Sequence, residues 1–130
     1  MFTDLNVFQL AHAMATHAGK RQTVVARNVA NADTPGYKAR DLEPFSAALT
    51  RGAREFAPRS TRAGHLAGSA GAVLPWAEVT AQTAGADPNG NTVSVEEEMM
   101  KAVEVKRQHD RALAIYKSSL TILRTSLGRA

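Results

Sequence analysis

Four histidines carry the side chains best suited to metal binding or acid–base catalysis, and their spacing indicates how they are used. The chain of 130 residues has no cysteine, which excludes disulfides, thiol nucleophiles and cysteine-ligated metals. His12 and His17 are five residues apart, which is not the i, i+4 spacing of a helical metal pair, and neither His65 nor His109 has a histidine neighbour at that spacing. We therefore expect no metal site, and we interpret the histidines as solvated or as lying at an interface.

A run of three glutamates, Glu96 to Glu98, is the other candidate for acid–base chemistry. It lies at the expected start of a helix, where carboxylates complement the positive end of the helix dipole. The sequence has no G-x-S-x-G elbow and no glycine-rich phosphate loop, and no Ser/His/Asp set carries a supporting signature. The adjacent pair Met99-Met100 is interpreted as core. We therefore expect neither an enzyme nor a bound cofactor.

The most specified stretch of the chain is residues 26–38, which reads ARNVANADTPGYK. Asn28 and Asn31 end a helical pattern rich in Ala and Val, and asparagine is a weak helix former whose side chain bonds nearby main-chain groups. Pro35 disfavours helical geometry at Thr34, so the helix should end before Thr34.

A reversal of the chain should follow this helix end. Pro35-Gly36 fits the central pair of a type II turn, because proline presets the negative φ and glycine accepts the positive one. The motif has two open interpretations: a cap and turn with no further role, or a local structure that helps subunits to pack. The residues of this candidate assembly motif are Asn28, Asn31, Thr34, Pro35, Gly36 and Tyr37.

Two long amphipathic helices are expected at opposite ends of the chain, over about 5–30 and about 95–126. The second begins at a capping-box pattern, Ser94 with Glu97, and Gly128 provides its stop. Heptad spacing along both predicts that they pack against each other as a coiled-coil-like hairpin with the termini at one end. The residues expected to carry this helix packing are Val7, Leu10, Met14, Val24, Met99, Leu113, Tyr116, Leu120, Leu123 and Leu127.

Apolar residues outside this seam, such as Phe8, Val103, Ile115 and Ile122, are too many for a two-helix hairpin to cover. Helices with uncovered apolar faces imply partners, which favours an assembly protein.

The predicted fold class is mainly α, in one domain. Residues 1–40 hold the first helix and the turn motif, residues 41–92 form a flexible or partly extended central segment, and residues 93–130 hold the second helix, which forms one structural unit with 1–40. The central segment is either a disordered stretch that orders on assembly or a small insertion packed against neighbouring subunits.

Two short elements are expected in or near the central segment. Leu42, Phe45 and Leu49 have the spacing of a short helix. Residues 73–79 could form a short strand, which Pro75 would confine to a sheet edge.

Charge and hydropathy bound the location and partners of the chain. The net charge of +4 is modest and its basic residues are interspersed with acids, so nucleic-acid binding is not indicated, although Arg21, Arg27, Lys38 and Arg40 could form a basic patch. No apolar run approaches the ~20 residues of a spanning helix. The N-terminus lacks the basic region of a secretory signal, so the residues alone predict a cytoplasmic protein.

Residues 26–38 closely resemble the N-terminal signature of the flagellar basal-body rod, hook and hook-associated proteins, N-[IV]-A-N-x-x-T-P-G-[YF]-[KR]. The segments Gly90-Asn91-Thr92-Val93 and Glu98-Met99 resemble the C-terminal region of the same family. The short chain is most similar to subunits of the proximal rod. The resemblance implies a structural subunit of the basal-body rod, which assembles into a helical axial tube and transmits torque.

The resemblance also implies partners and a location. The partners are the rod proteins FlgC, FlgF and FlgG, the basal adaptor FliE and the flagellar type III export apparatus, with no nucleic acid and no small-molecule substrate. The location is the periplasmic rod of the bacterial flagellum, reached without a cleaved signal peptide. The alternative function is a cytoplasmic coiled-coil adaptor or regulator, which a closed dimer of fixed size would favour.

Overall fold

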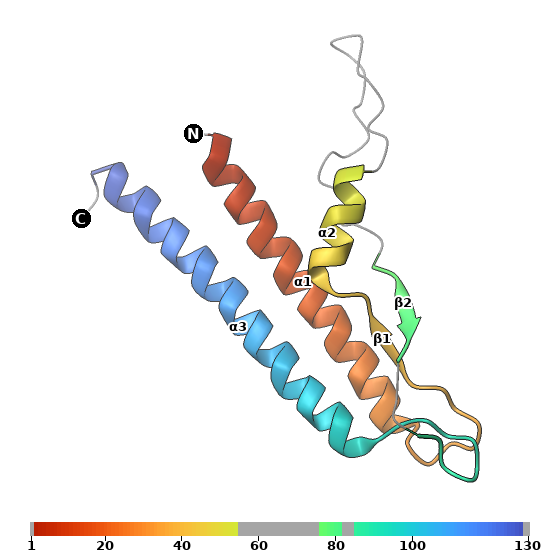
Figure 1. Ribbon diagram of the computed structural model, residues 1–130. Coiled ribbons are helices and arrows are strands. Elements are labelled where there is room, and N and C mark those ends of the chain that lie inside the picture. The colour runs from red at the N-terminus through yellow and green to blue at the C-terminus, as the bar shows by residue number, and fades with distance from the viewer. Residues whose placement is uncertain (1, 55–75, 82–84, 129–130) are drawn as a thin grey trace.

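Two long helices and a small central sheet make up the fold (Figure 1). The computed structural model describes residues 2–54, 76–81 and 85–128. In chain order the elements are α1 (Phe2–Ala30), β1 (Arg40–Leu42), α2 (Phe45–Arg54), β2 (Glu78–Thr80) and α3 (Val95–Ser126). α1 and α3 lie side by side and antiparallel, with both chain ends at the same end of the pair. The predicted mainly α fold with paired terminal helices is confirmed.

The ends of α3 follow the signals in the sequence. The Ser94 hydroxyl accepts a hydrogen bond from the Glu97 backbone N–H at 3.3 Å, as expected of an N-cap. At the other end, the backbone N–H of Leu127 returns to the Leu123 carbonyl at 3.0 Å, and Gly128 adopts a φ of 71°. A left-handed glycine after the last turn is a common helix stop, so α3 ends where predicted.

The central elements pack against α1. β1 and β2 pair antiparallel, with Arg40 opposite Thr80 and Leu42 opposite Glu78. The predicted short helix exists as α2, although Leu42 belongs to β1 instead. Val79 lies in β2 as expected for an extended segment, and residues 73–75 of that prediction fall outside the described residues.

A small core forms where these elements meet α1. Its buried members are Val24, Leu42, Ala48 and Trp76, with Phe45 packed against them. His17 belongs to the same site: its side chain is 2% exposed and its ring lies 4.9 Å from that of Trp76. The expectation of a solvated or interface histidine is therefore wrong for His17.

The seam between α1 and α3 is displaced from the one that heptad spacing predicted. On α3 the buried positions are Glu98, Val105 and Ala112, so Met99 and Leu113 of the predicted packing residues each lie one residue after a buried position. On α1 the buried heptad series is Ala11, Ala18 and Val25. The small side chains in these series let the two helices approach closely. The hydrogen bond between Asn28 and Glu98 sets the rotation of α3 about its axis.

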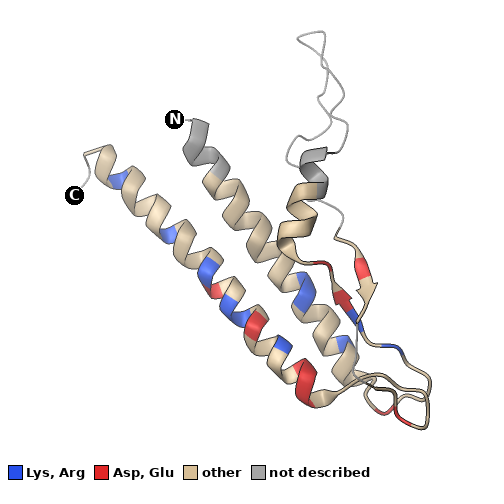
Figure 2. Ribbon diagram, in the orientation of Figure 1, with Lys and Arg blue, Asp and Glu red and all other residues tan. Residues whose placement is uncertain are grey.

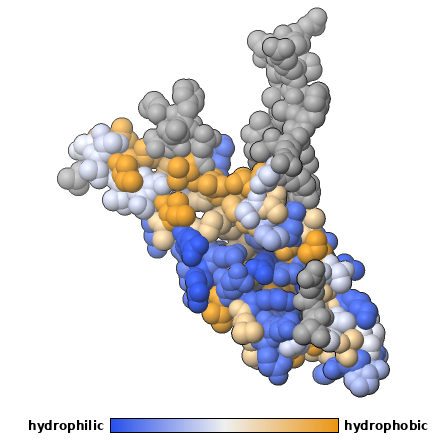
Figure 3. All heavy atoms as spheres, viewed as in Figure 1, coloured by the Kyte–Doolittle hydropathy of each residue, from blue (hydrophilic) through white to orange (hydrophobic). Residues whose placement is uncertain are grey.

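The larger apolar side chains therefore point outward more than expected. Of the residues predicted to pack the helices, Val24 is buried and Met14, Leu120 and Leu123 are half-buried, whereas the exposed ones are Val7, Leu10, Met99, Leu113, Tyr116 and Leu127. The Tyr116 ring nevertheless contacts Phe8 edge-on at 5.1 Å. Met99 and Met100 are 62% and 69% exposed, so their assignment to the core is wrong for the single chain. Figure 3 shows hydrophobic residues on the surface near the terminal ends of α1 and α3.

Within the described parts of the chain, none of the helices is both long and apolar enough to cross a membrane.

Candidate assembly motif and helix clamp

The motif after α1 forms the predicted helix stop and turn. α1 ends at Ala30, before Thr34. The Thr34 carbonyl accepts a hydrogen bond from the Tyr37 backbone N–H at 3.2 Å, which closes a four-residue turn around Pro35 and Gly36. Gly36 has a φ of 73°, the positive value that a type II turn requires at its third residue.

Asn28 is the polar centre of the motif. It is fully buried, at 0% exposure, and its side-chain amide makes four hydrogen bonds. The amide nitrogen donates to the Arg40 carbonyl at 2.6 Å and to the Glu98 carboxylate at 3.0 Å. The amide oxygen accepts from the Tyr37 hydroxyl at 3.3 Å and from the Arg40 backbone N–H at 3.2 Å. One side chain thus joins the end of α1, the turn, β1 and the start of α3.

Glu98 is the partner that carries this connection into α3. Its side chain is 1% exposed, and its second carboxylate oxygen accepts from the Lys101 ammonium at 2.7 Å. A buried carboxylate is costly unless it is paired and hydrogen-bonded, and Asn28 and Lys101 together supply those bonds. The prediction that the first-turn glutamates complement the helix dipole leaves out the main contacts of Glu98, which are those with Asn28 and Lys101.

Asn91 makes the second connection, from the loop before α3. Its buried side-chain nitrogen lies 2.7–3.0 Å from the backbone carbonyls of Asn31, Ala32 and Thr34, and its oxygen accepts from the Val93 N–H at 2.7 Å. These three carbonyls lie in the turn that follows α1. Asn91 therefore holds this turn from a position about 60 residues further along the chain.

The two turns also touch directly. The Gly36 backbone N–H donates to the Asn89 carbonyl at 3.0 Å, and a Cβ on Gly90 would lie 3.6 Å from the Gly36 Cα. The Lys38 ammonium donates to the Gly90 carbonyl at 2.9 Å. We call the whole arrangement the helix clamp, defined by Asn28, Gly36, Tyr37, Gly90, Asn91 and Glu98.

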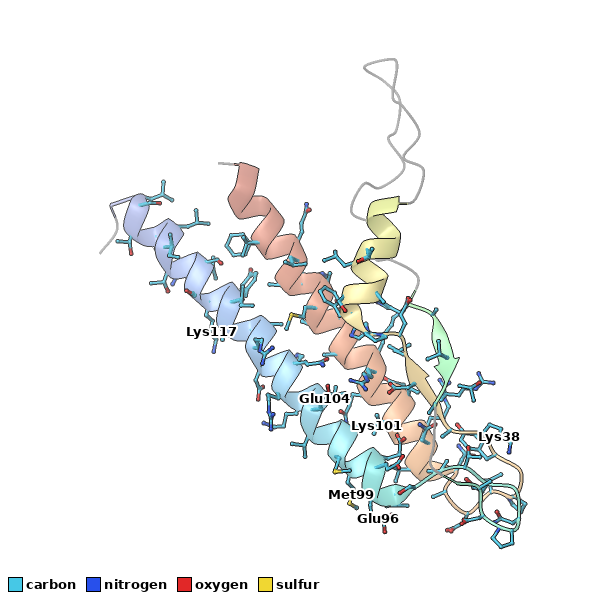
Figure 4. The ribbon with its side chains drawn as sticks, in the orientation of Figure 1. Lys38, Glu96, Met99, Lys101, Glu104 and Lys117 are labelled. Carbon is cyan, nitrogen blue, oxygen red and sulfur yellow. The ribbon has the colours of Figure 1, made fainter. Side chains whose placement is uncertain are left out.

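Arg21 adds a charged bridge further along the helix pair. Its guanidinium binds both carboxylate oxygens of Asp41, at 2.8 and 2.9 Å, and lies 3.4 Å from the Glu104 carboxylate of α3. Desolvation by itself would raise the pKa of Asp41, but the hydrogen bond and charge of Arg21 outweigh it and lower that pKa. Figure 4 shows Glu104 and Lys101 on the side of α3 that faces α1.

The predicted motif residues divide into two groups. Asn28 and Tyr37 turn inward to the clamp, and Asn31 bonds back to the Arg27 carbonyl at 2.8 Å. Thr34, Pro35 and Gly36 are exposed. The sequence reasoning missed Asn91 and Glu98 as partners of the motif. The turn cluster before α3 and the adjacent acidic run were the signals that could have pointed to them.

The basic residues near the motif each form an ion pair or a hydrogen bond within the chain. Besides Arg21 and Lys38, both Arg27 and Arg40 pair with Glu78, at 3.5 and 3.3 Å. The described residues contain no group of three or more side chains able to hold a metal ion. These features favour a structural role for the motif over ligand binding.

Long antiparallel terminal helices, joined by a buried polar clamp and exposing large apolar side chains, define a helical assembly subunit. The sequence model of the family described as "Flagella basal body rod protein" matches residues 12–38, which include the motif. The chain is 34% identical to the flagellar basal body rod protein FlgB of Agrobacterium fabrum, over 88% of this chain and 87% of that protein. The corresponding protein of Cereibacter sphaeroides is 32% identical over 82% of each chain, and that of Aeromonas hydrophila is 31% identical over 83% and 82%.

The chain belongs to the flagellar basal body rod protein family, and the relatives it matches over most of its length are FlgB proteins. It is a structural subunit of the rod in the flagellar basal body and not an enzyme.

Proposed function

We propose that the chain is the FlgB-type subunit of the proximal rod, and that its paired helices build a helical axial tube by packing against neighbouring subunits. The observation that carries the proposal is the helix clamp, which holds α1 and α3 as one rigid pair through Asn28 and Glu98. The same pair leaves large apolar side chains such as Met99, Met100 and Ile122 more than 60% exposed. Burying such side chains between subunits contributes about 25 cal/mol per Å² before the costs of association are subtracted.

In this proposal Asn28 and Tyr37 of the motif act through the fold of their own chain. Asn28 and Tyr37 are bonded inside the clamp, so their task is to set the pairing of the helices that neighbours contact. The helix-packing residues that are exposed in the single chain, among them Leu10 and Leu113, become covered in the rod. Heterologous contacts that do not close on themselves produce a helical tube of this kind.

The finer assignments rest on the family. The partners are the rod proteins FlgC, FlgF and FlgG and the adaptor FliE. The chain reaches the periplasmic rod through the flagellar export apparatus, without a cleaved signal peptide, and contributes to torque transmission there.

The test is incorporation into the rod. In the source bacterium with its own copy of the gene deleted, the wild-type chain should restore motility and appear in purified basal bodies by mass spectrometry. Asn28→Ala should reduce both, whereas Asn31→Ala, which removes only exposed local bonds to the Arg27 carbonyl and the Thr34 hydroxyl, should leave them close to wild type. A chain that stays in the cytoplasm as a closed dimer, with motility unaffected by its deletion, would support the adaptor function instead.

A further inference from the structure

Charge is distributed unequally along α3. Residues 95–104 contain four acidic residues and one basic residue, whereas residues 105–126 contain five basic residues and one acidic residue. Asp33 and Asp87 lie exposed in the loops beside the start of α3 and add to the acidic end. Figure 2 shows acidic residues at the start of α3, near the clamp, and basic residues over its distal half.

Four of the five basic residues of the distal part are free to bind an anionic group. Lys106 pairs with Asp110 at 3.2 Å. The remaining four are exposed and have no carboxylate within ion-pair distance among the described residues: Arg107, Arg111, Lys117 and Arg124. At the acidic end, Glu96 is exposed, and its carboxylate bonds locally, to the hydroxyl of the Ser94 cap and to its own backbone N–H.

Each charged region lies next to exposed apolar side chains on the outer side of α3. Near Glu96 these are Met99, Met100 and Val103, which are 60–69% exposed. Near Lys117 the most exposed of these is Ile122, at 63%, and Leu113, Ile115 and Tyr116 are 39–42% exposed. Figure 4 shows Glu96, Met99 and Lys117 directed away from α1. At about 100° per residue, helical spacing places Ile122 only about 40° from Met100 around the axis and about 100° from the buried series Glu98, Val105 and Ala112.

We propose that a second copy of this chain binds along the outer face of α3, with the acidic, methionine-bearing start of one α3 against the basic distal half of the next. The proposal rests on the proposed function, because assembly into a tube requires a contact that repeats without closing. Opposite charges at the two ends favour this alignment and disfavour an unstaggered parallel one, in which like charges would face each other.

The arrangement has a defined geometry. The two helices run parallel and are shifted so that Met100 of one copy meets Ile122 of its neighbour. The shift is 22 residues, or about 33 Å at 1.5 Å per residue. Each bound copy leaves its own distal half open, so further copies can add. An antiparallel pair would also match the charges, but it would cover both regions at once and stop at a dimer.

Charge reversal tests the electrostatic half of the proposal. Lys117→Glu should weaken self-association of the purified chain about tenfold in sedimentation velocity at low salt, because one attraction becomes a repulsion. Lys20→Glu, the same charge change on an exposed residue of α1, is the matched control and should have less than a twofold effect. Adding Glu96→Lys to Lys117→Glu should restore much of the lost association. Equal effects of the two lysine reversals, or no restoration, would overturn the proposal.

Disulfide cross-linking tests the direction of packing. The sequence has no native cysteine, so only introduced cysteines can form the cross-links. A chain carrying both Met100→Cys and Ile122→Cys should form a ladder of disulfide-linked oligomers on mild oxidation, and each single variant should stay mostly monomeric. A doubly linked dimer with no larger species would show antiparallel pairing, and an absence of cross-links would show that the faces do not meet; either overturns the proposal. Recovery of the chain in basal bodies despite these results would leave the proposed function standing and remove only this contact.

Discussion

Replacing Asn28 with alanine should destabilise the chain strongly, because four hydrogen bonds end on one buried amide. The bond to the Glu98 carboxylate is the strongest contribution, at about 1.5–3 kcal/mol for a bond to a charged group. The Arg40 backbone groups and the Tyr37 hydroxyl lose a partner as well, at roughly 0.5–1.5 kcal/mol each where water cannot fully replace it. Alanine favours the helix by up to ~0.7 kcal/mol, so the expected net loss is about 3 kcal/mol.

Urea unfolding of the purified chain measures this loss. Trp76 is the only tryptophan and is 9% exposed, so its fluorescence reports the small core, while far-ultraviolet circular dichroism reports the helices. Asn31→Ala is the matched control, because the Asn31 side chain makes only solvent-exposed local bonds, to the Arg27 carbonyl and the Thr34 hydroxyl. A loss for Asn28→Ala within ~1 kcal/mol of that for Asn31→Ala would refute the idea that the clamp holds the helices together.

Three further predictions follow from other contacts. The pKa of Asp41 is lowered below its ordinary value of 3.8, so its bond to Arg21 stabilises the fold above that pH and is lost as pH falls through the lowered pKa. Asp41→Asn should therefore reduce the loss of stability on acidification below the ordinary pKa of 3.8 in pH-dependent urea titrations; an unchanged loss would contradict this. Gly36→Ala should lower the free energy of unfolding by about 1 kcal/mol, because the φ of Gly36 is 73°. Gly19→Ala should raise it by up to about 1 kcal/mol, because Gly19 lies in mid-helix with open space around its Cβ. Thermal unfolding compares the two variants, and equal effects would argue against the turn geometry. Ala18→Leu should destabilise by about 1–3 kcal/mol because Ala18 is 1% exposed in the α1 seam, and denaturant unfolding showing no loss would place that seam elsewhere.

Local signals in the sequence were enough to predict the ends of α3 and the turn after α1. The boundaries of α3 followed from a cap at Ser94 and a stop at Gly128, and the reversal at Pro35-Gly36 followed from the φ preferences of those residues. Such features depend on neighbours a few residues apart, which is why they can be predicted from one chain.

The seam and the clamp depended on contacts that local patterns do not encode. Heptad spacing could not decide between the frames of Met99 and Glu98, because both repeat every seven residues. In the structure the heptad frame of Glu98 faces α1, because Glu98 bonds to Asn28, 70 residues away in the chain. His17 likewise became a core residue only because Trp76 and Phe45 arrive from the central segment. A hydrophobicity pattern favours the methionines, whereas the fold leaves them exposed for another subunit in our proposal.

Entry of this chain into the rod should require that the clamp holds its helix pair together. Quantitative mass spectrometry can measure this in basal bodies purified from cells producing wild-type chain, Asn28→Ala or Asn31→Ala at equal levels. We expect wild-type and Asn31→Ala chains in the basal body, and strong depletion of Asn28→Ala. Equal recovery of all three would contradict the role of the clamp, and absence of the wild-type chain from basal bodies would contradict its place in the rod.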